Sequence, residues 1–205
     1  KVSEYILNCR QMGIQILPPD INRSTGSFSV EDGSIRYGMA AVKGIGKPVM
    51  EAIVEERERG GAFSSLKDFC QRLSGKEVNK RTIENFIKAG AFDSLGGTRK
   101  QFMMIYVQVM DTVNQEKKSS MTGQMSLFDI MGEEDKKSFE IRMPDVGEYE
   151  KENKLAFEKE VLGVYISGHP LEEYADVWKK NITATTSDFQ PMEESEMPKV
   201  KDESK

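Results

Sequence analysis

The residues best suited to ligand chemistry form the run Lys43-Gly44-Ile45-Gly46-Lys47, where two glycines flank an isoleucine and a lysine stands at each end. Glycine lacks a Cβ, so its backbone can approach an anion closely. Pro48 follows and suits the first turn of a helix, whose free N–H groups favour a phosphate. An apolar stretch at 37–41 precedes the run. This order predicts a helix-hairpin-helix in which residues 43–47 hold a nucleic-acid backbone.

A plain tight turn is the alternative interpretation, because Gly-x-Gly also joins helices that bind nothing. The formal net charge of −5 argues at first against nucleic acid. Residues 1–118, however, carry 18 Lys and Arg against 14 Asp and Glu, whereas residues 119–205 carry 11 against 20. Local charge rather than the total attracts a polyanion. The small basic excess around the hairpin predicts modest, salt-dependent affinity.

Few residues suggest catalysis or metal binding. The single histidine, His169, cannot form a triad or a zinc site alone, and its neighbours indicate a turn that enters a helix. Cys9 and Cys70 lie on apolar helical faces without a Cys-x-x-Cys partner, which predicts buried free thiols in a reducing compartment. The chain contains no run of about 20 apolar residues that could span a membrane.

Hydrophobic spacing predicts a mainly α fold. We expect a tandem helix-hairpin-helix bundle preceded by a small β-hairpin element, with a flexible linker and C-terminal helices. The expected elements are a helix at 1–12, a strand at 14–17, a hairpin at 28–37, helices at 49–59, 65–73, 80–89 and 98–115, and later helices at 148–162 and from 170.

A second helix-turn-helix unit is predicted at 65–90, although its turn lacks the Gly-x-Gly pattern. Ser64 or Ser65 can cap its first helix, and Asn79 its second. Lys80 and Arg81 fall in the first turn after Asn79, so they are candidate phosphate contacts. Ordinary solvated surface charge is the alternative for both.

Residues 117–147 have the composition of a linker, rich in Lys, Ser, Gly, Glu and Asp. One apolar cluster interrupts it, Gln124-Met125-Ser126-Leu127-Phe128. Leu127 and Phe128 have no periodic apolar partners within the segment. The cluster therefore predicts a short docking peptide on a tether, with Leu127 and Phe128 filling an apolar pocket.

Taken together, these motifs resemble the alpha subunits of bacterial DNA polymerase III, of the DnaE type, from about residue 1 to 180. The resemblance depends on several motifs in one order: Gly13-Ile14 to Pro18-Pro19-Asp20-Ile21-Asn22, Ile35-Arg36-Tyr37-Gly38, Lys43-Gly44-Ile45-Gly46, Phe63 to Phe69, Asn79-Lys80-Arg81, Gly90-Ala91-Phe92-Asp93, and Gly163 to Leu171.

The resemblance implies a division of the chain. Residues 1–35 resemble the end of the fingers, and 36–116 resemble a tandem helix-hairpin-helix domain that binds duplex DNA. The linker at 117–147 would carry a sliding-clamp peptide of the form Gln-x-x-Leu-Phe, at Gln124–Phe128. Residues 148–182 resemble a helical connection towards an oligonucleotide-binding-fold domain, and 183–205 are expected to be a disordered tail.

The resemblance also implies a DNA-directed DNA polymerase as the parent, a nucleotidyltransferase that uses Mg²⁺ held by an acidic cluster. This chain has no such cluster, so we expect a segment that is inactive alone and carries no cofactor or metal. The implied partners are double-stranded DNA, the sliding clamp and other replicase subunits, in the cytoplasm and without a membrane. The rivals are a purely structural helical connector and a nuclease or repair enzyme, which would need a carboxylate or histidine cluster.

Overall fold

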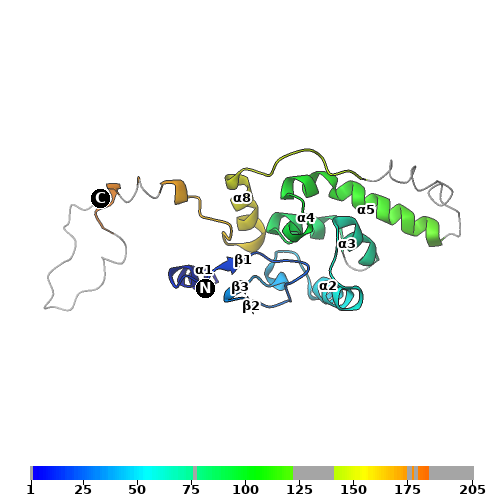
Figure 1. Cartoon of the computed structure of the whole chain (residues 1–205), viewed down its shortest axis with the longest axis horizontal. Helices are drawn as coiled ribbons and strands as arrows, with labels where there is room; N and C mark the ends of the chain where they lie inside the picture. Colours follow the sequence, from blue (N-terminus) through cyan, green and yellow to red (C-terminus); the bar gives the residue numbers. More distant parts are fainter. Residues whose placement is uncertain (1, 76–77, 122–140, 175–176, 178–179, 185–205) are drawn as a thin grey trace. The chain divides into compact units, whose positions relative to one another are not determined.

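The structure, a computed structural model, describes residues 2–75, 78–121, 141–174, 177 and 180–184 (Figure 1). The chain divides into two compact units, Lys1–Ser167 and Gly168–Lys205. The strands and α-helices named below all lie in the first unit. Within the described residues, no helix combines the length and the apolar character needed to cross a bilayer.

The first unit begins with helix α1 (Val2–Gln11) and a small sheet of strands β1 (Ile16–Leu17), β2 (Ser29–Glu31) and β3 (Ser34–Arg36). β2 and β3 pair antiparallel, as the sequence predicted. Asp32 and Gly33 between them both have positive φ, 48° and 78°, as a two-residue hairpin turn of type I′ requires. β1 pairs in parallel with β3 on its other side. That pairing links residues distant in sequence, and the local pattern did not predict it.

The helical part confirms the mainly α class. Its elements are the 3₁₀ helix η1 (Met39–Ala41), α2 (Lys47–Gly60), α3 (Leu66–Arg72), α4 (Lys80–Ala89), the 3₁₀ helix η2 (Asp93–Leu95), α5 (Arg99–Met121) and α8 (Lys151–Leu162). The helix predicted before the glycine hairpin is only the 3₁₀ turn η1. Ser65 and Asn79 cap α3 and α4 by accepting the Asp68 and Thr82 N–H groups. The second unit of the predicted tandem is therefore present in full, and the first is present with a 3₁₀ turn in place of its first helix.

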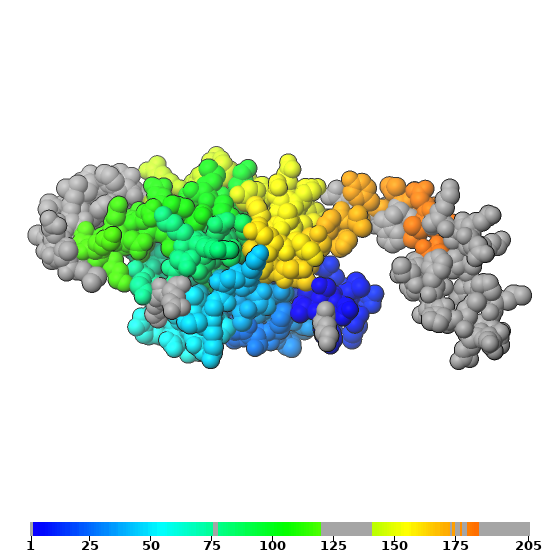
Figure 2. Space-filling view, turned by 180° about the vertical axis from the view of Figure 1, so that it is seen from behind, coloured from blue at the N-terminus to red at the C-terminus, as the bar shows by residue number. Residues whose placement is uncertain are grey.

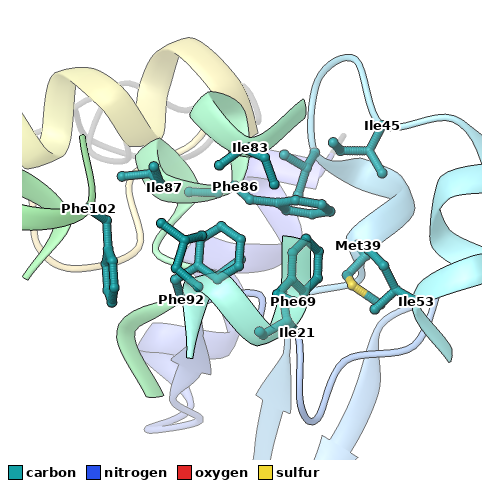
Figure 3. Packing of buried hydrophobic residues seen from close by; sticks show 14 of the residues in the cluster. Ile21, Met39, Ile45, Ile53, Phe69, Ile83, Phe86, Ile87, Phe92 and Phe102 are labelled. Atoms are coloured by element: carbon teal, nitrogen blue, oxygen red, sulfur yellow. The ribbon is translucent and has the colours of Figure 1, made fainter. Parts of the chain in front are cut away.

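An aromatic cluster forms the centre of the core (Figure 3). The Phe69 ring lies 4.9 Å from the Phe63 ring and 5.1 Å from the Phe92 ring, in edge-to-face contact. Phe92 in turn contacts Phe86 and Phe102, each at 6.1 Å. These rings come from α3, α4 and α5, from the loop before α3 and from the loop after α4. Full burial of such a side chain stabilises a fold by about 1.5–3 kcal/mol, so the cluster holds the two helical units together.

Residues before the predicted boundary at 35–36 share this core. The Asn22 side chain pairs with both backbone groups of Phe63: its amide donates to Phe63 O at 2.9 Å, and its oxygen accepts from Phe63 N at 2.7 Å. Arg57 of α2 donates to the carbonyls of Ile21 and Ser24. The segment expected to be the end of the fingers and the helix-hairpin-helix segment thus form one folded body.

Described residues at both ends of the predicted linker, 117–147, are structured. Helix α5 continues to Met121, beyond the expected end near Gln115. On the other side, Pro144 accepts a hydrogen bond from Gln101 at 2.9 Å, and Ile141 packs against the core. The predicted docking peptide, Gln124–Phe128, lies outside the described residues.

The start of α5 is capped from two directions. Thr98 and Gln101 bond reciprocally, each side chain accepting from the backbone N–H of the other, as in a capping box. Glu148 accepts from the N–H groups of Arg99 and Lys100 at 3.1 and 3.3 Å. Burial of the Glu148 carboxyl raises its pKa, but these N–H donors and that of Tyr149 outweigh burial and leave the pKa lowered. The carboxylate therefore ties the segment before α8 to α5.

In the second unit, the described residues include one 3₁₀ helix, η3 (Glu172–Tyr174). His169 Nδ1 accepts from the Leu171 N–H at 3.1 Å, which agrees with the predicted turn. Leu171, Tyr174 and Val177 are exposed. Residues 185–205, most of the predicted disordered tail, lie outside the described residues.

We expect Glu148→Gln to lower the free energy of unfolding by about 0.3–1 kcal/mol at pH 7, because it removes a carboxylate from a helix N-terminus. The Glu148 pKa is lowered in the folded state, so its contribution is present above the unfolded pKa and is lost as pH falls through the folded value. Urea unfolding at several pH values should show the wild type and the variant converge in acid. The control Glu55→Gln, at an exposed position in the middle of α2, should change little. A pH-independent difference for Glu148→Gln would contradict this account.

Candidate nucleic-acid interface

The glycine hairpin is fixed by its central residue. Ile45 is only 8% exposed and packs in the core with Ile83 and Phe86 nearby (Figure 3). Its N–H donates to Val42 O at 3.1 Å, which closes the turn. The sequence predicted that the Ile45 amide would hold a phosphate. In the structure this amide is already bonded within the loop, so we do not include it among the proposed phosphate contacts. Ile45 instead anchors the hairpin.

The glycines on either side of Ile45 face outward. Gly44 and Gly46 are exposed, and Gly44 has φ +77°, which favours glycine. The N–H groups of Gly44, Gly46 and Lys47 donate no hydrogen bond to the described part of the chain. Gly46 is the N-cap of α2 and offers no side chain to its N-terminus. Unpaired N–H groups at a helix start form a site suited to an anion.

The backbone N–H and the backbone carbonyl of Lys43 each form a hydrogen bond with a helix that is distant in sequence. Its N–H donates to Val161 O of α8 at 2.8 Å, and its carbonyl accepts from Asn85 Nδ2 of α4 at 2.7 Å. Figure 2 shows the light-blue segment that includes the hairpin against the yellow helix α8. Sequence reasoning missed Asn85 and the contribution of α8. The available signal was weak: a polar residue beside Phe86 in an apolar stripe, where a buried amide needs a partner.

The predicted cationic side chains separate into two groups. Lys43 and Arg81 are exposed, and neither side chain pairs with another described residue. Lys47 pairs with Glu51 at 3.3 Å, and Lys80 pairs with Asp111 of α5 at 2.8 Å. Exposed pairs of this kind contribute only about 0–1 kcal/mol, so they can exchange for another anion.

Arg81 stands one helical turn before Asn85, and residues four apart share a face of an α-helix. Since Asn85 contacts the hairpin, Arg81 lies on the side of α4 that faces it. Lys80 is directed to α5 by its ion pair. Helix geometry thus leaves Arg81 on the side of α4 that carries Asn85, whereas the Lys80 ammonium is engaged with Asp111 of α5.

The site has no features of a metal centre or a reactive thiol. Among the residues that the structure places, no three His, Cys, Asp or Glu side chains gather as a metal site would require. Cys70 is buried, and burial raises its pKa to about 12, whereas Cys9 is only half-buried. The arrangement suits noncovalent binding of an anionic backbone.

Comparisons with known proteins agree with the helix-hairpin-helix architecture. A family model described as a helix-hairpin-helix motif matches residues 13–102, which include both helical units. The chain is 39% identical over 175 residues to DNA polymerase III subunit alpha of Mycobacterium leprae. The matched region covers 85% of this chain and 15% of that protein. It is 40% identical over 174 residues to the subunit of Borreliella burgdorferi, with the same coverage, and 39% identical over 188 residues to that of Vibrio cholerae, covering 91% and 16%. The chain thus spans about 15% of the length of these curated relatives, and the predicted resemblance is confirmed.

Proposed function

The chain corresponds over most of its length to a segment of bacterial DNA polymerase III alpha subunits, and on this basis we propose that it binds duplex DNA for such a polymerase. The observation that carries the proposal is the exposed hairpin, whose N–H groups at Gly44, Gly46 and Lys47 are unpaired within the described residues and whose Lys43 side chain, like that of Arg81 on α4, is exposed and in no ion pair there. A family match to a helix-hairpin-helix motif supports the same conclusion.

The proposed contacts go to phosphates. The N–H groups of Gly44, Gly46 and Lys47 would receive one phosphate, and Lys43 and Arg81 would add counter-charge. Lys80 would contribute only by leaving Asp111. Contacts to phosphates carry no base information, so binding should be independent of sequence. Each neutralised phosphate releases counterions, so binding should weaken steeply with salt.

We also propose that Gln124–Phe128 docks on a sliding clamp. The support is its motif and its position: it falls between α5 and α8, which are both parts of the same folded unit. A peptide attached at both ends to a DNA-binding body would raise the effective concentration of clamp and DNA for each other. Weak DNA binding and peptide docking would then act together.

Template-directed DNA synthesis is the activity that we propose for the parent protein, because the named relatives are polymerase subunits. The Mg²⁺ ions of such chemistry would stabilise the attacking and leaving oxygens. The described residues of this chain do not fit such a site, since they gather no carboxylate cluster. We therefore assign this segment no chemical step and expect it to be inactive alone. Other replicase subunits and a cytoplasmic location stay predictions.

DNA binding can be tested by fluorescence anisotropy with a labelled duplex over a range of salt. We expect Lys43→Ala with Arg81→Ala to weaken binding several-fold and to reduce the slope of log K against log salt by about 2, since two phosphate contacts are lost. The control is Lys67→Ala with Arg142→Ala. It removes the same charge, but Lys67 pairs with Glu116 of α5, and Arg142 lies in the segment that contacts the start of α5.

Equal losses of DNA affinity in the two double variants would show that the binding depends on overall positive charge and not on the proposed site. No wild-type affinity at low salt would instead favour the structural connector.

Clamp docking can be tested with a peptide spanning residues 122–130 and a purified bacterial sliding clamp. Leu127→Ala with Phe128→Ala should abolish binding, because the two side chains that fill the apolar pocket are removed. Met125→Ala with Ser126→Ala is the matched control at the two variable positions and should bind nearly as the wild type does. Calorimetry measures both. Undiminished binding by the Leu127 and Phe128 variant would refute the assignment.

A further inference from the structure

We infer that Asn85 and helix α8 are positioning groups for the DNA-binding hairpin. They hold the two backbone polar groups of Lys43 and so fix the direction of the amides that follow. We name these two hydrogen bonds, to Val161 O and from Asn85 Nδ2, the Lys43 anchor. The inference rests on the proposed phosphate contact, but the anchor itself can be measured without DNA.

The geometry of the anchor constrains the loop on both sides of Lys43. The bond to Val161 O is 2.8 Å and the bond from Asn85 is 2.7 Å, both short and well within hydrogen-bond range. Asn85 is only 7% exposed, so losing its bond would leave a buried polar group unpaired. The Asn85 amide also lies against Gly44, where an added Cβ would come within 3.1 Å of Nδ2. A side chain at position 44 would therefore crowd the anchor, in addition to the strain of the positive φ.

Helix α8 can act as an anchor because its own end is fixed. Glu158 is fully buried and accepts from the N–H groups of Ile166 and Ser167 at 2.8 and 3.0 Å and from Arg99 at 3.2 Å. The Tyr37 hydroxyl donates to Leu162 O at 2.9 Å. The last carbonyls of an α-helix have no partner inside the helix. Here two of them receive donors from the segment that leads into the hairpin.

This arrangement has a functional consequence. α8 follows residues 122–140, the segment that contains the proposed docking peptide, and the hairpin precedes them. One of the two hydrogen bonds of the Lys43 anchor thus comes from a helix on the far side of that segment. DNA binding by this chain should therefore depend on residues 151–167 although none of them belongs to the helix-hairpin-helix match at 13–102.

The first test uses the unmodified chain and amide hydrogen exchange by NMR. The Lys43 amide should exchange about tenfold or more slowly than the Gly46 and Lys47 amides, because only the Lys43 amide is bonded within the fold. Equal exchange at Lys43 and Gly46 would overturn the anchor.

The second test uses Asn85→Leu, which keeps a similar volume, adds no charge and removes the donor. We expect shifted amide resonances at Gly44 and Gly46 and several-fold weaker DNA binding by the folded fraction, which circular dichroism measures. The control Asn22→Leu removes a second side-chain amide that joins distant segments. Asn22 forms its hydrogen bonds with Phe63, away from the hairpin. It should lower stability but leave those resonances and the DNA affinity unchanged. A stability loss in both variants with unchanged hairpin resonances and affinity would show that Asn85 is merely structural.

Glu158→Gln tests the α8 half without touching the hairpin. Because Glu158 also pairs with buried Arg99, exchange is read in its folded fraction, and the first test on the unmodified chain serves if neither variant folds. We expect faster exchange at the Lys43 amide together with weaker DNA binding. Loss of protection at Ile166 and Ser167 with full protection at Lys43 would overturn the role of α8. Wild-type DNA affinity reports on the proposed function and Lys43 exchange on the anchor, so failure of one is distinguishable from failure of the other.

Discussion

The rest of the structure depends on the ion pairs that the buried guanidinium of Arg99 makes with Asp93 and Glu158. It is 2% exposed and contacts Asp93 at 3.0 Å, Glu158 at 3.2 Å and the carbonyl of Lys88 at 3.3 Å. Removing one partner of a buried ion pair costs about 3–5 kcal/mol, because the other charge stays uncompensated. The requirement to pair Arg99 therefore brings together the end of α4, the start of α5 and the middle of α8. Helix α8, which Glu158 joins to Arg99, in turn bonds to the glycine hairpin through the carbonyl of Val161.

This constraint explains why the two sides of residues 122–140 form one folded unit. Composition alone indicates a flexible connection across 117–147, yet Glu148 caps α5 and Glu158 neutralises Arg99. Lys88 adds an ion pair to Glu160 at 3.0 Å. Each contact links α8 or the residues before it to helices earlier in the chain. The described residues on both sides of 122–140 therefore belong to the one unit that we propose binds DNA.

Features set by neighbouring residues could be predicted from the sequence. The caps at Ser65, Asn79 and Thr98, the Asp32-Gly33 turn and the Gly44 conformation all follow from side chains within a few residues. Features set by distant residues could not. The pairing of β1 with β3, the Asn85 bond to Lys43 and the docking of α8 depend on which segments the core brings together. The bond from the Ile45 N–H to Val42 O could not be predicted for a related reason, because the pattern locates the hairpin without showing which N–H groups its own turn uses.

The central claim is that the outward amides of the hairpin hold a DNA phosphate. An NMR titration of the ¹⁵N-labelled chain with a short duplex tests it most directly, because each backbone amide reports separately. The largest shifts should fall on Gly44, Gly46 and Lys47, with smaller ones on Ile45, whose amide stays bonded to Val42. Saturable shifts confined to other elements, with the hairpin amides unchanged, would contradict it.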